Sequence, residues 1–240
     1  MKQDNWLART ELLIGKERLE ELKLSHVLIV GLGGVGAYAA EMLCRTGIGN
    51  LTIVDSDTIH SSNINRQLPA LHSTIGQSKV ALTEVRLKDI NPQINIVALQ
   101  EFLKDERTIE LLDNNKFDFV VDAIDSISPK VFLIYHTLLR KIPIISSLGA
   151  GGKMDLSKIE ITDISKTYRC ALAKIVRKKL KTLGIVEGLP VVFSSEPVSK
   201  ESIILVEDEQ NKKSSTGTIS YLPAVFGCYM AQYVIANICK

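Results

Sequence analysis

The chain has 240 residues, of which 45% are hydrophobic, and its net charge is only +2. This size allows one α/β domain with a sizeable core, or one domain with a smaller appendage. The four cysteines (Cys44, Cys170, Cys228 and Cys239) form no C-x-x-C pair, which argues against a disulfide framework and a zinc site. We therefore expect no zinc, a reducing cytoplasmic compartment and, because residues 1–10 are polar and charged, no signal peptide.

The predicted elements alternate between helix and strand. Residues 5–24 are predicted to be helical, because their leucines are spaced for one face. Further along the chain, strands are predicted at 27–30, 50–55, 94–99, 117–121 and 142–146, and helices at 77–90, 105–114 and 128–140. This alternation predicts a Rossmann-like, doubly wound and mainly parallel sheet with helices on both faces.

A glycine-rich turn follows the first predicted strand. Gly31, Gly33 and Gly36 read G-x-G-x-x-G, with Gly34 between them, and an alanine-rich helical pattern begins at once. Glycines let the backbone approach a phosphate, and the free N–H groups of the following helix attract that anion. A tight turn without a ligand is the alternative, and the flanking strand and helix favour a nucleotide site over it.

After residue 148 the pattern changes. An antiparallel strand is predicted at 158–164, an amphipathic helix at 171–183, short strands at 191–194 and 202–206, and a mobile polar loop at 207–216. The most apolar run, 219–239, is interrupted by Pro223, Gly227, Gln232 and Asn237, so we predict a buried helix and no stable membrane insertion. The expected organisation is one domain in three parts: N-terminal helices (1–24), a nucleotide-binding core (25–148) and a substrate-binding extension (149–240).

Polar residues follow the predicted strands. Asp55 ends the second strand, where a carboxylate can accept hydrogen bonds from ribose hydroxyls. Arg66 follows in a loop with Asn63, and Lys79 opens the next helix; cations at these positions suit a triphosphate better than NAD. Asp125 follows the fourth strand, where it is placed to hold Mg²⁺. Each residue alone is more often a solvated loop charge, but together they indicate ATP.

Five motifs resemble the adenylating superfamily of ThiF, MoeB and the ubiquitin-activating enzymes: residues 31–36, 54–57, 62–67, 76–79 and 122–125. The resemblance implies a homodimer in which Arg9 is supplied across the interface. It also implies catalytic roles for Arg9, Arg66, Lys79 and Asp125, with magnesium on Asp125. The implied nucleotide-binding residues are Gly31, Gly33, Gly34, Gly36, Asp55, Asp57, Asn63, Arg66, Lys79, Asp122 and Asp125.

The second half narrows the family. Residues 149–155, 161–167, 193–196 and 217–221 resemble the tRNA threonylcarbamoyladenosine dehydratases, and the similarity spans nearly the whole chain. The resemblance implies that ATP activates the carboxylate of N6-threonylcarbamoyladenosine in tRNA, next to the anticodon, and that the activated group closes into a ring. Many members carry Asp-Pro where this chain has Arg169-Cys170, so no role transfers to that pair.

A basic stretch adds independent support for an RNA substrate. Residues 166–181 contain seven basic side chains and no acidic one. Four of them share one predicted helical face: Lys174, Arg177, Lys178 and Lys181. A solvated helix face is the ordinary explanation for a charge run, but such faces usually mix signs. We therefore predict that this face binds tRNA.

Ring closure needs no protein nucleophile, because the attacking and activated groups belong to one substrate and the enzyme mainly positions them. The sequence assigns no general base: His72 and Glu196 are candidates, and residues of both types are more often structural or solvated. Two alternatives stay open, an adenylyltransferase for a ubiquitin-like sulfur carrier and a non-catalytic nucleotide-binding module. The sequence also leaves open whether a cysteine desulfurase or sulfur acceptor takes part, and whether a monovalent cation binds.

Overall fold

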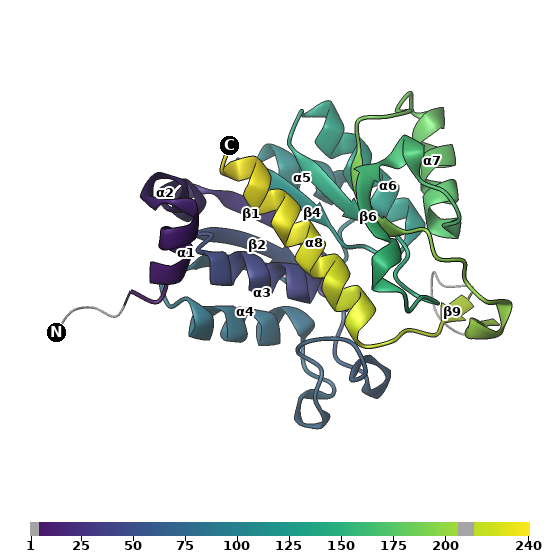
Figure 1. Cartoon of the computed structure of the whole chain (residues 1–240), viewed down its shortest axis with the longest axis horizontal. Coiled ribbons are helices and arrows are strands. Elements are labelled where there is room, and N and C mark those ends of the chain that lie inside the picture. The colour runs from purple at the N-terminus through teal and green to yellow at the C-terminus, as the bar shows by residue number, and fades with distance from the viewer. Residues whose placement is uncertain (1–4, 206–213) are drawn as a thin grey trace.

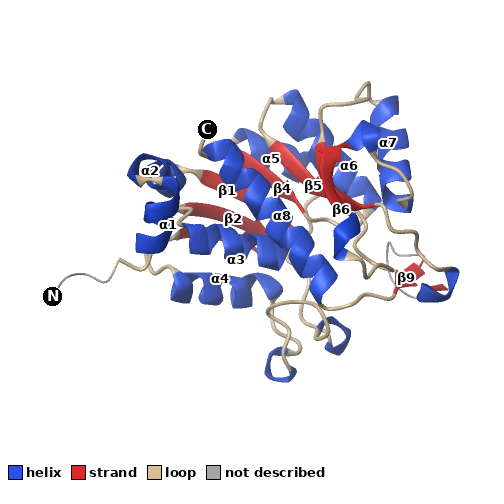
Figure 2. Cartoon of the chain, in the orientation of Figure 1, coloured by secondary structure: helices blue, strands red, loops and turns tan. Residues whose placement is uncertain are grey.

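The computed structural model, which describes residues 5–205 and 214–240, is built on a seven-stranded sheet (Figures 1 and 2). The strand order is β3-β2-β1-β4-β5-β7-β6. All neighbouring strands are parallel except β6 and β7, which pair antiparallel. The predicted fold class, a doubly wound and mainly parallel sheet with an extension, is confirmed.

The strands of this sheet are β1 (His26–Val30), β2 (Asn50–Val54), β3 (Asn95–Leu99), β4 (Phe119–Asp122), β5 (Ile144–Ser147), β6 (Ile159–Asp163) and β7 (Pro190–Ser194). The helices are α1 (Ala8–Ile14), α2 (Lys16–Leu24), α3 (Gly36–Thr46), α4 (Lys79–Ile90), α5 (Asp105–Asp113), α6 (Ile127–Leu139), α7 (Ala171–Thr182) and α8 (Tyr221–Ile238).

Helices cover both faces of the sheet. One buried cluster joins the sheet to α3, α4 and α8, and includes Leu43, Leu87 and Phe226. A second joins the opposite face to α5, α6 and α7, and includes Leu112, Leu133 and Val176. Strands β1 and β4 are almost entirely buried, which explains their continuous apolar sequence. The sheet is therefore a fixed platform for the loops at its carboxyl edge.

The N-terminal segment differs from its prediction in one respect. Residues 5–24 form two helices, because Gly15, with φ of +87°, breaks the run between α1 and α2. A left-handed backbone is strained for residues other than glycine, so Gly15 suits this corner. Leu19 and Leu22 are buried on α2, whereas α1 buries no residue of its own.

The extension confirms most predicted elements and corrects one, the polar loop 207–216. Strand β7 pairs parallel with β5 and continues the main sheet, and β6 then adds the predicted antiparallel edge. Of the predicted loop 207–216, residues 214–216 form strand β9 (Ser214–Thr216), paired with β8 (Ile203–Leu205), and 207–213 lie outside the described residues. The apolar run 219–239 is helix α8, as predicted. No helix among the described residues is long and apolar enough to cross a membrane.

Candidate nucleotide-binding site

The candidate site lies where the order of the sheet reverses. The chain runs outward from β1 through β2 to β3 and then returns to place β4 on the other side of β1. Val30, at the end of β1, pairs with Asp122, at the end of β4. Ligands of open α/β sheets bind outside the carboxyl ends of the strands at such a switch point. The glycine turn and the 122–125 turn both leave the sheet here.

The glycines of the turn have different tasks. A Cβ on Gly36 would lie 1.8 Å from the carbonyl oxygen of Gly31, and one on Gly31 would lie 2.7 Å from that of Ala123. These two glycines are needed because backbone passes where a side chain would be. The nearest neighbour of a Cβ on Gly33 would be Gln67 Nε2, at an ordinary 3.7 Å. The surrounding protein atoms therefore do not require a glycine at that position, whereas a ligand that approached the backbone would.

Asp55 ties the glycine turn to strand β2. Its carboxylate accepts hydrogen bonds from the N–H groups of Leu32, at 2.6 Å, and Asp57, at 2.8 Å. Burial raises the pKa of Asp55, and the nearby Lys79 ammonium and these N–H donors oppose that shift. The carboxylate therefore shapes the glycine turn and lies directly beside it.

Lys79 is an almost buried cation at this edge. Its side chain is only 5% exposed, and its Nζ lies 2.8 Å from Asp57 Oδ2. Asp57 is well exposed, so this pair faces the loop edge and not the core. A phosphate arriving here would have to share or replace the Asp57 carboxylate. The predicted proximity of Asp55, Asp57 and Lys79 is thus present in the fold.

Arg66 and Asn63 lie in the loop that follows. Arg66 Nη1 donates to the carbonyl oxygen of Ser62 at 2.8 Å, and its stem packs beside Gly34. Burial lowers the pKa of Arg66, while the charge of Asp125 acts in the opposite direction. Asn63 is buried and accepts a hydrogen bond from the His60 N–H at 3.0 Å. The structure therefore brings Arg66 within electrostatic range of Asp125.

Gln67 also lies at the candidate site. It belongs to the 62–67 motif, but the sequence analysis predicted no role for it. Its side chain is 8% exposed and lies against Gly33. Among the described residues, its Oε1 is the one buried side-chain oxygen or nitrogen without a hydrogen-bond partner. A buried acceptor without a donor is costly, so a ligand that supplies a donor fits this position.

Asp122 corrects the predicted set. Its side chain is fully buried and faces into the protein, where Lys130 Nζ lies 2.6 Å from its Oδ2. It is therefore a support beneath the site and not a residue placed to touch a nucleotide. No sequence pattern marked Lys130 as its partner, because a lysine in a helix is ordinarily exposed.

The structure does not gather Arg9 and the two candidate bases, His72 and Glu196, with the residues described above. Arg9 is exposed on α1, which packs on α2 at the end of the sheet where β1 begins (Figure 1). His72 is exposed in a short 3-10 turn. The carboxylate of Glu196 accepts hydrogen bonds from the N–H groups of Met154 and Asp155, both at 2.8 Å. Glu196 therefore holds a turn of the extension.

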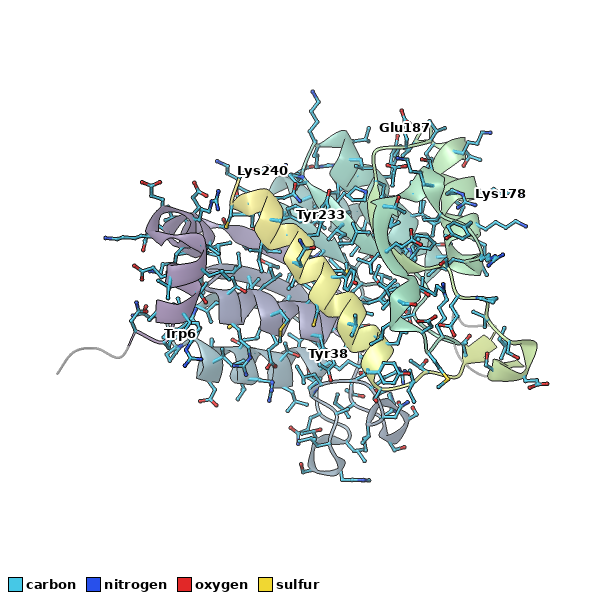
Figure 3. All side chains as sticks on the ribbon, in the orientation of Figure 1. Trp6, Tyr38, Lys178, Glu187, Tyr233 and Lys240 are labelled. Carbon is cyan, nitrogen blue, oxygen red and sulfur yellow. The ribbon has the colours of Figure 1, made fainter. Side chains whose placement is uncertain are left out.

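The basic helix α7 presents only part of its predicted face. Lys174, Lys178 and Lys181 are exposed, and Lys178 points away from the protein body (Figure 3). Arg177 is half-buried and donates to the Thr167 carbonyl oxygen at 2.6 Å, so it is a structural tether. The helical repeat of the sequence places Ile175 on the apolar side of this helix. Ile175 is nevertheless 41% exposed, because the buried face is formed by Ala173, Val176 and Leu180.

The residues present suit a magnesium–triphosphate better than a metal held by protein alone. Within residues 5–205 and 214–240, no three His, Cys, Asp or Glu side chains gather into a metal site. Mg²⁺ usually takes one or two carboxylates and completes its shell with water and substrate phosphates. Asp125 is a single carboxylate that interacts electrostatically with Arg66, and it fits that pattern.

Comparisons with known proteins agree with this geometry. The model of the ThiF family matches residues 7–240. A tRNA threonylcarbamoyladenosine dehydratase of Bacillus subtilis is 41% identical, over 97% of this chain and 94% of that protein. The crystal structure of the Escherichia coli tRNA N6-threonylcarbamoyladenosine dehydratase in complex with ATP has a TM-score of 0.87 at 30% identity, over 99% and 96% of the two chains. A molybdopterin-synthase adenylyltransferase of Haemophilus influenzae is 34% identical over only 67% of this chain and 65% of that protein. The chain therefore belongs to the ThiF family, as its motifs predicted.

Proposed function

We propose that this chain is an ATP-dependent tRNA threonylcarbamoyladenosine dehydratase. It adenylates the carboxylate of N6-threonylcarbamoyladenosine in tRNA, next to the anticodon, and closes the activated group into a ring. The observation that carries the proposal is the similarity to the Bacillus subtilis dehydratase, which includes the extension as well as the nucleotide half. The sulfur-carrier adenylyltransferase match covers a smaller share of the chain.

The chemistry requires two displacements. A carboxylate oxygen of the substrate attacks the α-phosphorus of ATP, and pyrophosphate leaves. The neighbouring carbamoyl group then attacks the activated carbonyl carbon, and AMP leaves with that carboxylate oxygen, so the nucleoside has lost one water. Holding both reacting groups on one substrate replaces a bimolecular encounter.

The chain's own residues supply position and charge. Arg66 and Lys79 bind the phosphates, with Asn63 beside them, and stabilise the charge that develops on the leaving pyrophosphate. Asp55 accepts from the ribose hydroxyls, and the backbone of Gly33 and Gly34 approaches the phosphates. Asp125 is the residue that would hold Mg²⁺, and the metal would supply positive charge to the phosphates. On ATP binding, Lys79 would share its contact to Asp57 with the phosphates or exchange it for them.

The active unit is a homodimer in which Arg9 serves the partner's site. Helix α1 buries no residue of its own, and Leu12 and Leu13 are 89% and 85% exposed. Next to α1, an apolar groove is lined by Ile14, Arg18, Met42, Cys228, Ala231 and Cys239. Helix α8, which forms one wall, carries no charged residue. An uncharged helix and an uncovered leucine pair suit a second copy of this chain.

The exposed lysines of α7 bind tRNA phosphates, whereas Arg177 supports the helix. The loop of Asn65 lies close to the extension, since Asn65 Nδ2 donates to the Thr218 carbonyl oxygen at 2.8 Å. RNA held by the extension would therefore border the nucleotide.

The decisive experiment incubates the protein with ATP and either tRNA that carries N6-threonylcarbamoyladenosine or a sulfur-carrier protein. We expect AMP release and a nucleoside lighter by one water with the tRNA alone. AMP or an acyl-adenylate formed only with the carrier protein would favour the adenylyltransferase alternative. ATP binding without AMP release in either mixture would favour a non-catalytic module.

The dimer has its own test in mixed subunits. An Arg9→Ala subunit and a Lys79→Ala subunit are each expected to be inactive as homodimers. Mixed one to one and allowed to exchange, they should recover about one quarter of the active sites, because only half of the dimers are mixed and each has one complete site. No recovery in a confirmed heterodimer would contradict the role of Arg9 across the interface.

A further inference from the structure

Three buried side chains form a cluster directly behind the nucleotide-binding edge: Lys130 on α6, Asp122 on β4 and Ser146 on β5, here called the Lys130 cluster. The side chains of Lys130 and Asp122 are both 0% exposed. Lys130 Nζ and the Ser146 hydroxyl each donate to Asp122 Oδ2 at 2.6 Å. Nζ also lies 3.2 Å from Ser146 Oγ. The carboxylate is thus held from two elements at once.

A buried ion pair of this kind is expected to add little to the free energy of unfolding. Removing both charges from water costs about as much as their attraction in the interior gives back, and well-packed apolar residues often hold a core as well. The contact made by the other carboxylate oxygen, Asp122 Oδ1, indicates a role in positioning the backbone. Asp122 Oδ1 accepts the main-chain N–H of Ile124 at 3.1 Å, so the carboxylate fixes the turn by which the chain leaves β4.

That turn is in direct contact with the glycine turn. The carbonyl oxygen of Ala123 lies 2.7 Å from where a Cβ on Gly31 would be, and the Ala123 Cβ lies 3.1 Å from the corresponding point on Gly36. Ala123 N–H also donates to the Val30 carbonyl oxygen at 2.9 Å. Asp125 comes two residues later. A shift of the 122–124 backbone would therefore move the phosphate cradle and Asp125 together.

We propose that Lys130 is a positioning residue for adenylation: through Asp122 it holds the 122–125 turn, and with it the glycine turn and Asp125, in the geometry that receives ATP. Lys130 touches neither nucleotide nor RNA. The inference rests on the proposed function, since it assigns Lys130 to that same site.

The test compares Lys130→Met with Leu133→Ala, a matched control on the same helix. Leu133 is fully buried in the α5, α6 and α7 core and makes no bond to the cluster. All measurements are made at a temperature where thermal unfolding shows each variant to be folded. Lys130→Met should lower kcat/KM for AMP formation about a hundredfold, the loss expected from a displacement of about one ångström. Its affinity for an ATP analogue, measured without RNA in Mg²⁺ and in EDTA, should also fall, and Leu133→Ala should keep both values.

A second variant separates position from stability. Lys130→Met combined with Asp122→Leu replaces the ion pair with apolar residues and should recover the unfolding temperature but not nucleotide affinity. Ser146→Ala removes one donor to Asp122 and should weaken affinity less than Lys130→Met. The inference is overturned if the apolar pair restores affinity and turnover along with stability, or if Ser146→Ala binds as tightly as the parent. Should Lys130→Met not fold, these two variants decide. A parent that binds ATP but never dehydrates the tRNA would refute the proposed function, while the affinities would still test Lys130.

Discussion

Residues 26–147 form five parallel strands joined by helices. Residues 148–205 and 214–220 add β7 and the antiparallel edge strand β6 to the same sheet, with helix α7 between them, and the separate pair β8 and β9. In the first region, the site residues follow the carboxyl ends of strands, and the sheet itself sets their positions. In the second, side chains hold the turns: Lys153 Nζ donates to the Ser194 carbonyl oxygen, and Asp163 accepts from the N–H groups of Ser165 and Gly188.

This difference separates two kinds of task. The nucleotide half requires rigid placement around a ligand that never varies, and a parallel sheet provides it. Under the proposed function the extension would fit a large RNA, and turns held by individual side chains can change without disturbing the sheet. Substitutions should therefore affect ATP chemistry in the first region and RNA recognition or local stability in the second.

The largest effect is expected at the glycine turn. Gly36→Ala would force a Cβ to within 1.8 Å of the Gly31 carbonyl oxygen, so we expect a loss of stability of about 3 kcal/mol or more and no ATP binding. Gly33→Ala meets no protein atom closer than 3.7 Å, so the fold should persist while ATP affinity falls. Thermal unfolding and nucleotide titration distinguish the two. Unaltered ATP affinity in Gly33→Ala would show that the phosphates do not approach this backbone.

The next effect concerns the cations of the first region. Arg66→Ala and Lys79→Ala should each slow AMP formation by about a hundredfold to a thousandfold, the usual loss for one group that stabilises transition-state charge. Lys88→Ala is the matched control, because Lys88 lies on the same helix as Lys79 but pairs with Glu84 at the surface. Near-normal turnover of both variants, with the control also normal, would contradict the assignment of the phosphate site.

The first region was also the more predictable one. Apolar runs, a glycine triplet and acids after strands follow from local rules, and they placed Asp55, Arg66, Lys79 and Asp125 near one edge. The orientation of Asp122 was not predictable, because it depends on Lys130, a partner eight residues away that is buried only in the assembled core. The orphaned oxygen of Gln67 likewise appears only when the loop is packed against Gly33.

In the second region, the sequence pattern predicted where helices and strands lie but not which of their faces are buried. The helical repeat grouped Arg177 with the exposed lysines, but its guanidinium donates a hydrogen bond to the Thr167 carbonyl oxygen and is half-buried. The repeat also put Ile175 on the buried side, although α7 packs through Ala173, Val176 and Leu180. Which flank of an amphipathic helix is covered depends on the neighbouring elements, here α6 and the turn before α7, and a sequence does not give their positions.

A smaller effect is expected from the exposed face of α7. Changing Lys174, Lys178 and Lys181 to Gln should weaken tRNA binding and flatten its salt dependence by about one unit of log–log slope, or slightly less, for each lost contact. ATP affinity should not change. Three exposed lysines elsewhere, Lys16, Lys23 and Lys88, changed to Gln form the control set.

Arg177→Gln sharpens that comparison. Because Arg177 bonds to Thr167, its loss should lower the unfolding temperature while the salt slope stays near that of the parent. An α7 triple variant with the parent's tRNA affinity at every salt concentration would show that this helix does not face RNA.

The smallest effect on turnover is expected from the cysteines, which occur in both regions. Replacing all four with Ala or Ser should leave ring closure measurable and close to the parent, since both displacements use groups of the substrate and ATP. Burial raises the pKa of Cys44 to about 12 and also raises the pKa of Cys228 and Cys239, so at neutral pH these three thiols are poor nucleophiles. Cys44 is fully buried in the core, so its loss should cost about 1 kcal/mol of stability. Turnover is therefore compared at a temperature where unfolding curves show both proteins to be folded. A folded cysteine-free variant that forms AMP but no ring, or a protein thioester trapped from the parent, would place a cysteine in the reaction after all.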